Sequence, residues 1–301
     1  MKLLVFGANG QVGQELLRAL RPLGTVLATT RSGKLPDGSS CEQADFDVPQ
    51  TLNALLDRLQ PQVVINAAAY TAVDKAETDR EAAFRANAEA PGVIAAWCAA
   101  HAVPMVHYST DYVFPGQDAR PYREDDATAP LGVYGESKLA GEQAVRAAGG
   151  SHLIFRTAWV YASHGNNFLR TMLRVGAERD ELKVVADQIG TPTTAALIAD
   201  ATAMALQRHS GERSGTWHLT AGGETSWHGF AEAIFDQAVK AGLLPHAPRV
   251  LAITTAEYPT PARRPAYSRL DTTRLQDDFG IPLADWRDGL RHVIGELAAR
   301  R

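Results

Sequence analysis

The fold of this 301-residue chain is decided by its opening stretch, Leu3-Leu4-Val5-Phe6-Gly7-Ala8-Asn9-Gly10-Gln11-Val12-Gly13. Four consecutive apolar residues predict a strand that is buried on both faces of a parallel sheet. Beyond the glycines, Val12, Leu16, Leu17 and Leu20 recur at helical spacing. The order strand, glycine turn, helix is what a phosphate-binding loop requires, because glycines let the backbone approach a pyrophosphate at the helix N-terminus. The alternative is a tight turn that binds nothing.

The rest of the chain alternates between short apolar runs and helical patterns. This alternation predicts an α/β fold, a Rossmann-like doubly wound parallel sheet with a smaller C-terminal α/β lobe. We expect residues 1–160 to form the dinucleotide-binding domain, with part of the later chain returning to it, and residues 161–301 to form mainly a substrate-binding lobe. Strands are expected at 3–6, 25–29, 63–65, 104–108, 153–156, 183–185 and 216–219, and the longer helices at 81–100, 134–148, 168–177, 195–208, 227–241 and 286–299.

Composition limits the partners of the chain. A net charge of −4 and a pI of about 6.1 give no basic field for nucleic acid or an anionic membrane. No stretch approaches the roughly 18 apolar residues of a transmembrane helix. The two cysteines, Cys41 and Cys98, have no C-x-x-C spacing, which favours a reducing compartment. We therefore expect a cytoplasmic protein.

Tyr134 and Lys138 form a Tyr-x-x-x-Lys pair one helical turn apart. An ammonium near a phenol favours the phenolate, which would make the tyrosine usable in proton transfer near neutral pH. The alternative is two residues on a solvated helix face. Thr110 follows the strand expected at 104–108 and so lies at the carboxyl edge of the sheet, where α/β proteins bind ligands.

Arg31 follows the second predicted strand, in the sequence Thr30-Arg31-Ser32. A cofactor with a free ribose 2′-hydroxyl usually meets an acidic residue at this position, and none is present here. An arginine between hydroxyls suits a 2′-phosphate, so NADPH is predicted over NADH. The alternative is an exposed loop arginine without a ligand.

Taken together, these motifs resemble the extended short-chain dehydrogenase/reductases, and within them the dTDP-4-dehydrorhamnose reductase family. The resemblance spans most of the chain and rests on the segments 7–13, 66–77 (Asn-Ala-Ala-Ala-Tyr-Thr-Ala-Val-Asp-Lys-Ala-Glu), 109–114 (Ser-Thr-Asp-Tyr-Val-Phe), 134–138, 156–161 and 187–193 (Asp-Gln-Ile-Gly-Thr-Pro-Thr). It implies reduction of the C4 ketone of a nucleotide sugar by NADPH, with NADH as an alternative cofactor.

The resemblance also assigns roles to residues. Tyr134 would protonate O4, Lys138 would lower the pKa of Tyr134 and hold the nicotinamide ribose, and Thr110 would bind the ketone. Asp111, Tyr112 and Trp159 match substrate-contacting positions. The cofactor positions are Gly7, Gly10, Gln11, Val12, Gly13, Arg31, Asp45, Phe46, Ala67, Ala68, Ala69, Tyr70, Thr71, Tyr108, Tyr134 and Lys138.

The chain departs from the family at two places. Some members build a Mg²⁺-linked homodimer from glutamates; Glu15 and Glu296 match two of them, but Ala196 stands at the third position. Both the metal and the dimer are therefore in doubt. Tyr267 stands where many relatives have Asn.

One related function is disfavoured: the dehydratases of this superfamily carry an Asp-Glu pair after the threonine, and here Asp111-Tyr112 lacks the second carboxylate. Two alternative functions stay open on the sequence, an epimerase that retains NAD and a non-catalytic NADP-binding regulatory subunit. Consumption of NADPH with a keto-sugar nucleotide would separate these functions from a reductase.

Overall fold

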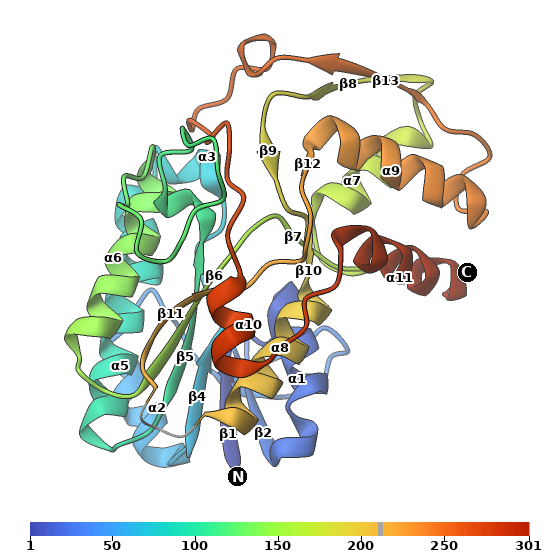
Figure 1. The fold of residues 1–301 in the computed structure, drawn as a ribbon. Coiled ribbons are helices and arrows are strands. Elements are labelled where there is room, and N and C mark those ends of the chain that lie inside the picture. Colours follow the sequence, from blue (N-terminus) through green and yellow to red (C-terminus); the bar gives the residue numbers. More distant parts are fainter. Residues whose placement is uncertain (210–212, 301) are drawn as a thin grey trace.

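A seven-stranded sheet forms the centre of the molecule in the computed structural model, which describes residues 1–209 and 213–300 (Figure 1). The strand order is β11-β6-β5-β4-β1-β2-β3, and every neighbouring pair is parallel. The predicted doubly wound parallel sheet is confirmed. The strands are β1 (Lys2–Phe6), β2 (Thr25–Thr30), β3 (Glu42–Gln43), β4 (Val63–Asn66), β5 (Met105–Thr110), β6 (His152–Thr157) and β11 (Gly215–His218).

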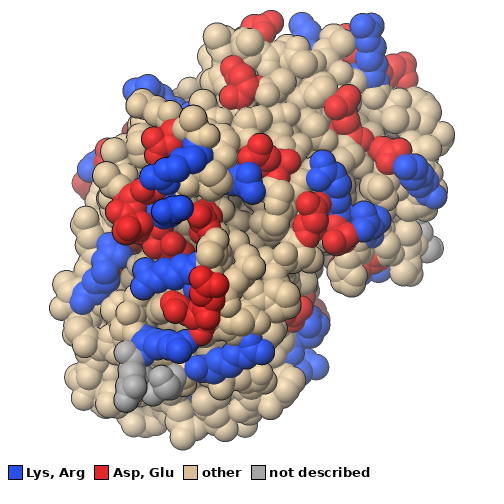
Figure 2. Space-filling view, viewed as in Figure 1, with Lys and Arg blue, Asp and Glu red and all other residues tan. Residues whose placement is uncertain are grey.

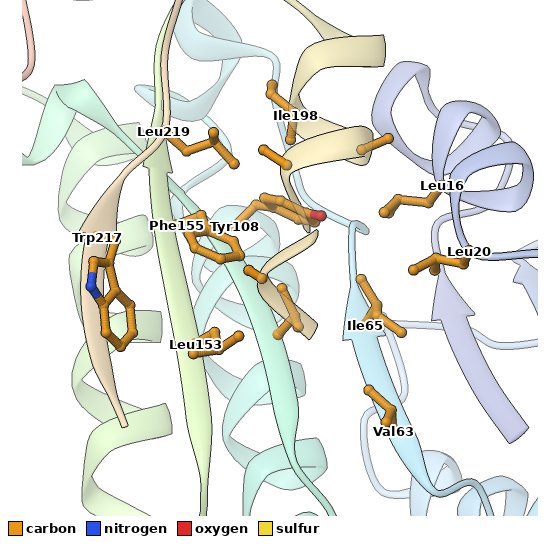
Figure 3. Close-up of a cluster of buried hydrophobic side chains, with 14 of the residues drawn as sticks. Leu16, Leu20, Val63, Ile65, Tyr108, Leu153, Phe155, Ile198, Trp217 and Leu219 are labelled. Atoms are coloured by element: carbon orange, nitrogen blue, oxygen red, sulfur yellow. The ribbon is translucent and has the colours of Figure 1, made fainter. Parts of the chain in front are cut away.

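Apolar side chains leave both faces of this sheet, because successive residues of a strand point to opposite sides. On β1, Leu3 and Val5 pack into one hydrophobic cluster, and Leu4 and Phe6 pack into another. The first cluster is covered by α1 (Gln11–Ala19), α8 (Ala195–Arg208) and α10 (Thr273–Phe279); the second by α2 (Thr51–Leu59), α5 (Ala90–Ala100) and α6 (Val133–Ala147). Figure 3 shows the first cluster, with Leu16 and Ile198 of the covering helices against Ile65 and Tyr108 of the strands.

The helical segment expected at 81–100 contains an irregularity. It consists of α4 (Arg80–Phe84), a π-helical turn (Arg85–Glu89) and α5. Asn87 lies in the π turn and is buried. Its side chain accepts a hydrogen bond from the Tyr70 N–H at 2.8 Å and donates to the Ser137 hydroxyl at 3.0 Å. The turn therefore joins the loop after β4 to the start of α6, two segments with predicted site residues.

The later chain builds a separate hydrophobic cluster around Phe230, Phe235 and Trp286. Its elements are α7 (Phe168–Gly176), α9 (Trp227–Lys240), α11 (Trp286–Ala299), and the parallel pair β8 (Glu181–Val185) and β13 (Arg249–Ile253). Two short pairs join this region to the sheet: β7 (Val160–Tyr161) with β10 (Thr193–Thr194), and β9 (Ile189–Gly190) with β12 (Thr225–Ser226). Since β11, α8 and α10 pack at the central sheet, the chain after residue 160 contributes to both regions; the division at 160 stays a prediction.

Residues 254–272, called the crossing segment below, lead from β13 to α10 and pass the carboxyl end of the sheet. Arg264 of this segment donates to Asp74 at 2.8 Å; Asp74 lies in the short helix α3 (Val73–Ala76). Leu270 forms an isolated bridge with Tyr122, and the Tyr267 N–H donates to the Gly116 carbonyl. These contacts fasten the crossing segment over the loops that follow β4 and β5.

On the face shown in Figure 2, acidic and basic side chains are interspersed. In the part of the chain that the structure describes, no helix is both long and apolar enough to cross a bilayer.

Candidate active site

A cleft lies where the direction of the strand order reverses, at the carboxyl ends of β1 and β4. This is the position at which open α/β sheets bind ligands. The cleft has a volume of about 400 Å³. Gly7 has φ +76°, and a Cβ atom there would lie 2.6 Å from the Ala68 backbone nitrogen. Only glycine therefore permits the close approach of the two loops that form the floor of the cleft.

The cleft contains many of the predicted cofactor residues. Those that line it are Gly7, Gly10, Arg31, Phe46, Ala67, Ala68, Ala69 and Tyr70. The lining also contains Thr30, noted above as a neighbour of Arg31, and Asn9, Thr29, Ala44, Asp47 and Ala86, to which the sequence assigned no role. The other predicted positions, Gln11, Val12, Gly13, Asp45, Thr71, Tyr108, Tyr134 and Lys138, are not part of its lining. Gly13 has a packing role, since a Cβ there would lie 2.1 Å from the Gly7 carbonyl oxygen.

Tyr108 differs most from its expected place. Its ring is buried in the first hydrophobic cluster (Figure 3), and its hydroxyl lies 2.7 Å from the Thr202 hydroxyl. Because side chains alternate along β5, Tyr108 points into the core, and it presents only its backbone carbonyl to the site. That carbonyl accepts a hydrogen bond from Lys138 Nζ at 2.5 Å.

No acid stands next to Arg31 in the sequence, but two acids lie beside it in the structure. The Arg31 guanidinium lies 3.2 Å from Asp47 Oδ2 and 3.5 Å from Asp45 Oδ1. Both acids lie in the loop after β3. The flanking hydroxyl of Thr30 is also occupied, because it donates to the Lys34 carbonyl and accepts from the Lys34 N–H. Sequence distance concealed these partners: the two acids follow Arg31 by 14 and 16 residues, but they lie in the loop just after β3, the strand that pairs with β2.

Tyr134, Thr110 and Asp111 come together at the start of α6 and the end of β5. The Thr110 hydroxyl donates to Asp111 Oδ1 at 2.9 Å and also interacts with the Tyr134 phenol. The ring of Tyr112 meets that of Tyr134 edge-on, with centroids 5.7 Å apart. Four of the predicted catalytic and substrate residues, Thr110, Asp111, Tyr112 and Tyr134, are therefore in contact with one another.

The pKa of Tyr134 departs from the predicted direction. Burial, followed by the negative charge of Asp111, raises the pKa of the Tyr134 phenol to about 12, and the Thr110 hydrogen bond lowers it only partly. Lys138 was expected to lower this pKa, but its ammonium group is bonded to the Tyr108 carbonyl instead. Tyr134 is therefore protonated at neutral pH, the state that a proton donor needs.

Lys138 is itself buried, which lowers the pKa of its amine to about 8, while the nearby Glu142 carboxylate acts in the opposite direction. Glu142 is one turn further along α6 and is fully buried. It accepts two hydrogen bonds from Arg156, both at 2.8 Å. The sequence did not reveal this carboxylate–guanidinium pair, whose carboxylate is the charge that acts on Lys138.

Asp111 is a buried acid with an unusual pKa. Burial raises the pKa of its carboxyl to about 6, against hydrogen bonds from Ser268 and Thr110 that lower it. Ser268 belongs to the crossing segment. A second, much smaller cavity of about 10 Å³ lies beside Tyr112 and Tyr134 and is closed by Arg263 and Pro265 of the same segment. The crossing segment thus forms one wall of the site.

Trp159 lies after β6 in a left-handed conformation, φ +47°, which is rare for a residue other than glycine. Its ring stacks on Trp227 with centroids 3.5 Å apart and an interplanar angle of 4°. Gly190 leaves room for this ring, because a Cβ there would lie 2.5 Å from it. Trp227 begins α9 and was expected only as a helix residue; nothing in its local sequence indicated a partner 68 positions earlier.

The residues that raised the question of metal have partners on the protein. Glu15 accepts hydrogen bonds from His164 and Arg18, and Glu296 pairs with His292 on α11. Within residues 1–209 and 213–300, no group of three or more His, Cys, Asp or Glu side chains could hold a metal ion.

Comparison with known proteins shows the family of this chain. The model of the RmlD substrate binding domain family matches residues 1–299. A relative named dTDP-4-dehydrorhamnose reductase from Burkholderia thailandensis is 50% identical over the full length of both chains. A solved structure of a dTDP-4-dehydrorhamnose reductase from Clostridium acetobutylicum has a TM-score of 0.89 at 37% identity and covers 99% of both chains. Another, from Bacillus anthracis in complex with NADP, has a TM-score of 0.87 at 33% identity, covering 98% of this chain and 99% of its own. The chain therefore belongs to the RmlD substrate binding domain family and, with these relatives, to the dTDP-4-dehydrorhamnose reductases, a family of NAD(P)H-dependent oxidoreductases.

Proposed function

We propose that the protein reduces the C4 ketone of dTDP-4-dehydro-L-rhamnose with NADPH and releases dTDP-L-rhamnose. The product would serve as a precursor of cell-surface polysaccharide such as the lipopolysaccharide O-antigen, made in the cytoplasm. The single observation that supports this best is the group formed by Thr110, Asp111 and Tyr134, close to a cleft at the strand-order reversal. Family membership supplies the substrate.

The residues of the cleft fit a dinucleotide. Gly7 and Gly10 leave the backbone bare at the N-terminus of α1, whose first turn contains no acidic side chain. The free N–H groups and the dipole of that helix favour a pyrophosphate. Arg31 lies at the other end of the lining and would face the 2′-phosphate. The B. anthracis relative, solved with NADP, supports this cofactor.

When bound, NADPH supplies the hydride. The protein's own residues would then do three things. Tyr134, protonated at neutral pH, would donate its phenolic proton to O4. The Thr110 hydroxyl, whose one proton points to Asp111 Oδ1 in this structure, would turn to donate that proton's hydrogen bond to the same oxygen as negative charge develops there. Lys138, held by the Tyr108 carbonyl, would place a positive charge beside the nicotinamide ribose.

The substrate would extend from this group toward the C-terminal lobe. Asp111 and Tyr112 lie next to Tyr134, and Trp159 is held by its stack on Trp227. An aromatic face of this kind is suited to a pyrimidine base or a sugar. Trp227 would act as a positioning residue, since it fixes the orientation of Trp159.

With purified protein, the NADPH absorbance at 340 nm should fall only when dTDP-4-dehydro-L-rhamnose is present. NMR should identify dTDP-L-rhamnose as the product. An epimerase would instead convert a nucleotide sugar without net NADPH consumption. A regulatory subunit would bind NADPH and leave the keto sugar unchanged.

A further inference from the structure

The cleft that we assign to the cofactor contains an acid whose position bears on the choice between NADPH and NADH. Arg31 and Asp47 both line it, at the end formed by Thr29 and Thr30 of β2. The two side chains form an ion pair across 3.2 Å. The only arginine of the cleft lining described here is thus already paired with a carboxylate of the same lining.

Asp45 holds this pair in place. Its Oδ1 accepts a hydrogen bond from the Asp47 N–H at 3.0 Å and lies 3.5 Å from Arg31 Nε. One guanidinium therefore faces two carboxylates, and the three side chains together have a formal charge of −1. The Arg31 side chain is 67% exposed, so it is not locked by packing and can exchange one partner for another.

The two cofactors would meet this arrangement differently. A 2′-phosphate brings about 1.5 to 2 negative charges. To bind Arg31, the phosphate must break the Arg31–Asp47 ion pair, and it then lies beside the carboxylate of Asp47, which repels it. A ribose 2′-hydroxyl is neutral; it can donate to a carboxylate while Arg31 keeps its partner. The carboxylate of Asp47 consequently opposes NADPH and assists NADH.

We propose that Asp47 sets the cofactor preference of this protein by competing with the 2′-phosphate for Arg31. This inference deepens the proposed function, because it concerns the cofactor of the same reaction. It predicts that the preference for NADPH is smaller than an unpaired arginine would give, so that NADH is also bound. Asp47 is thus a specificity-determining residue. The residues that directly follow β2 do not reveal it, because an arginine there simply predicts NADPH.

Direct binding measurements test the proposal without any sugar nucleotide. The full-length protein is titrated calorimetrically with NADP⁺ and NAD⁺, and with the fragments 2′,5′-ADP and 5′-AMP. Asp47→Asn should raise the ratio Kd(NAD⁺)/Kd(NADP⁺) about three- to tenfold, the size of one or two exposed charge interactions. Arg31→Ala should lower that ratio, and Asp47→Asn should gain less in the Arg31→Ala background than in wild type.

Asp37→Asn is the matched control. Asp37 is an exposed acid in the same loop region that hydrogen-bonds to Ser39 and does not line the cleft. It should leave the ratio unchanged. An Asp47→Asn protein whose ratio stays within twofold of wild type would overturn the proposal, as would an equal change in both affinities, which would mean a structural role. Failure of the wild type to reduce the keto sugar would contradict the proposed function and leave this binding result standing.

Discussion

Glu142→Gln tests how the buried charges behind Lys138 are balanced. Glu142 is fully buried, and Arg156 is 4% exposed and donates two 2.8 Å hydrogen bonds to it. Glutamine keeps the volume of the side chain and removes its charge, so the Arg156 guanidinium stays buried without a counter-ion. Breaking such a pair from one side costs about 3–5 kcal/mol. For a chain of this size, the midpoint of thermal unfolding should fall by roughly 5–15 °C.

The same change should alter the pH profile. Glu142 raises the pKa of Lys138 against its burial, which by itself lowers that pKa. Without the carboxylate, the Lys138 amine should lose its proton below about pH 8, and the alkaline decline of kcat/KM should begin at lower pH. The assay combines thermal unfolding with kcat/KM between pH 6 and 10.

Two further variants make this test specific. Glu178→Gln removes an exposed acid that lies 3.7 Å from Arg174, and it should change stability by less than about 0.5 kcal/mol. The double variant Glu142→Leu/Arg156→Met replaces both buried charges and should regain most of the lost stability. A Glu142→Gln protein within 1 kcal/mol of wild type, with an unshifted alkaline limb, would refute the reasoning.

Three other predictions concern the site. In wild type, kcat/KM should decline above about pH 8 as Lys138 loses its charge, whereas Lys138→Met should raise the Kd for NADPH and show no such step; a wild-type profile that is flat to pH 10 would argue against a charged lysine. Trp227→Ala should raise the KM for the sugar nucleotide about three- to tenfold and change kcat little, because it removes the ring that fixes Trp159; unchanged steady-state kinetics would make the stack purely structural. EDTA should leave activity and oligomeric state unchanged, since Ala196 interrupts the glutamate set; a Mg²⁺-dependent dimer in light scattering would contradict this.

Most of the fold could be predicted because its main strands and helices have clear local hydrophobic patterns. The apolar run before Gly7 specifies a buried strand, and the helices at 195–208 and 286–299 have the predicted bounds. The strand β13 and the helix α10 were missed because both are short and their burial depends on neighbours far away in sequence.

Positions in the candidate site could be predicted where the residues lie in one motif, as with Gly7 and Gly10, which both line the cleft. They were not predictable where function depends on proximity in space. Asp47 lies next to Arg31 only because β3 pairs with β2. The family resemblance assigned Tyr108 to the cofactor site, and strand alternation turns its ring into the core.

Tyr134→Phe tests the central claim most directly. The substitution keeps the ring that packs against Tyr112 and removes only the phenolic hydroxyl. NADPH consumption with dTDP-4-dehydro-L-rhamnose should fall about 10²–10⁴-fold, the usual contribution of general acid catalysis. The melting temperature and the Kd for NADPH should match those of wild type. A Tyr134→Phe protein that reduces the keto sugar at close to the wild-type rate would contradict the assignment and place the proton donor elsewhere.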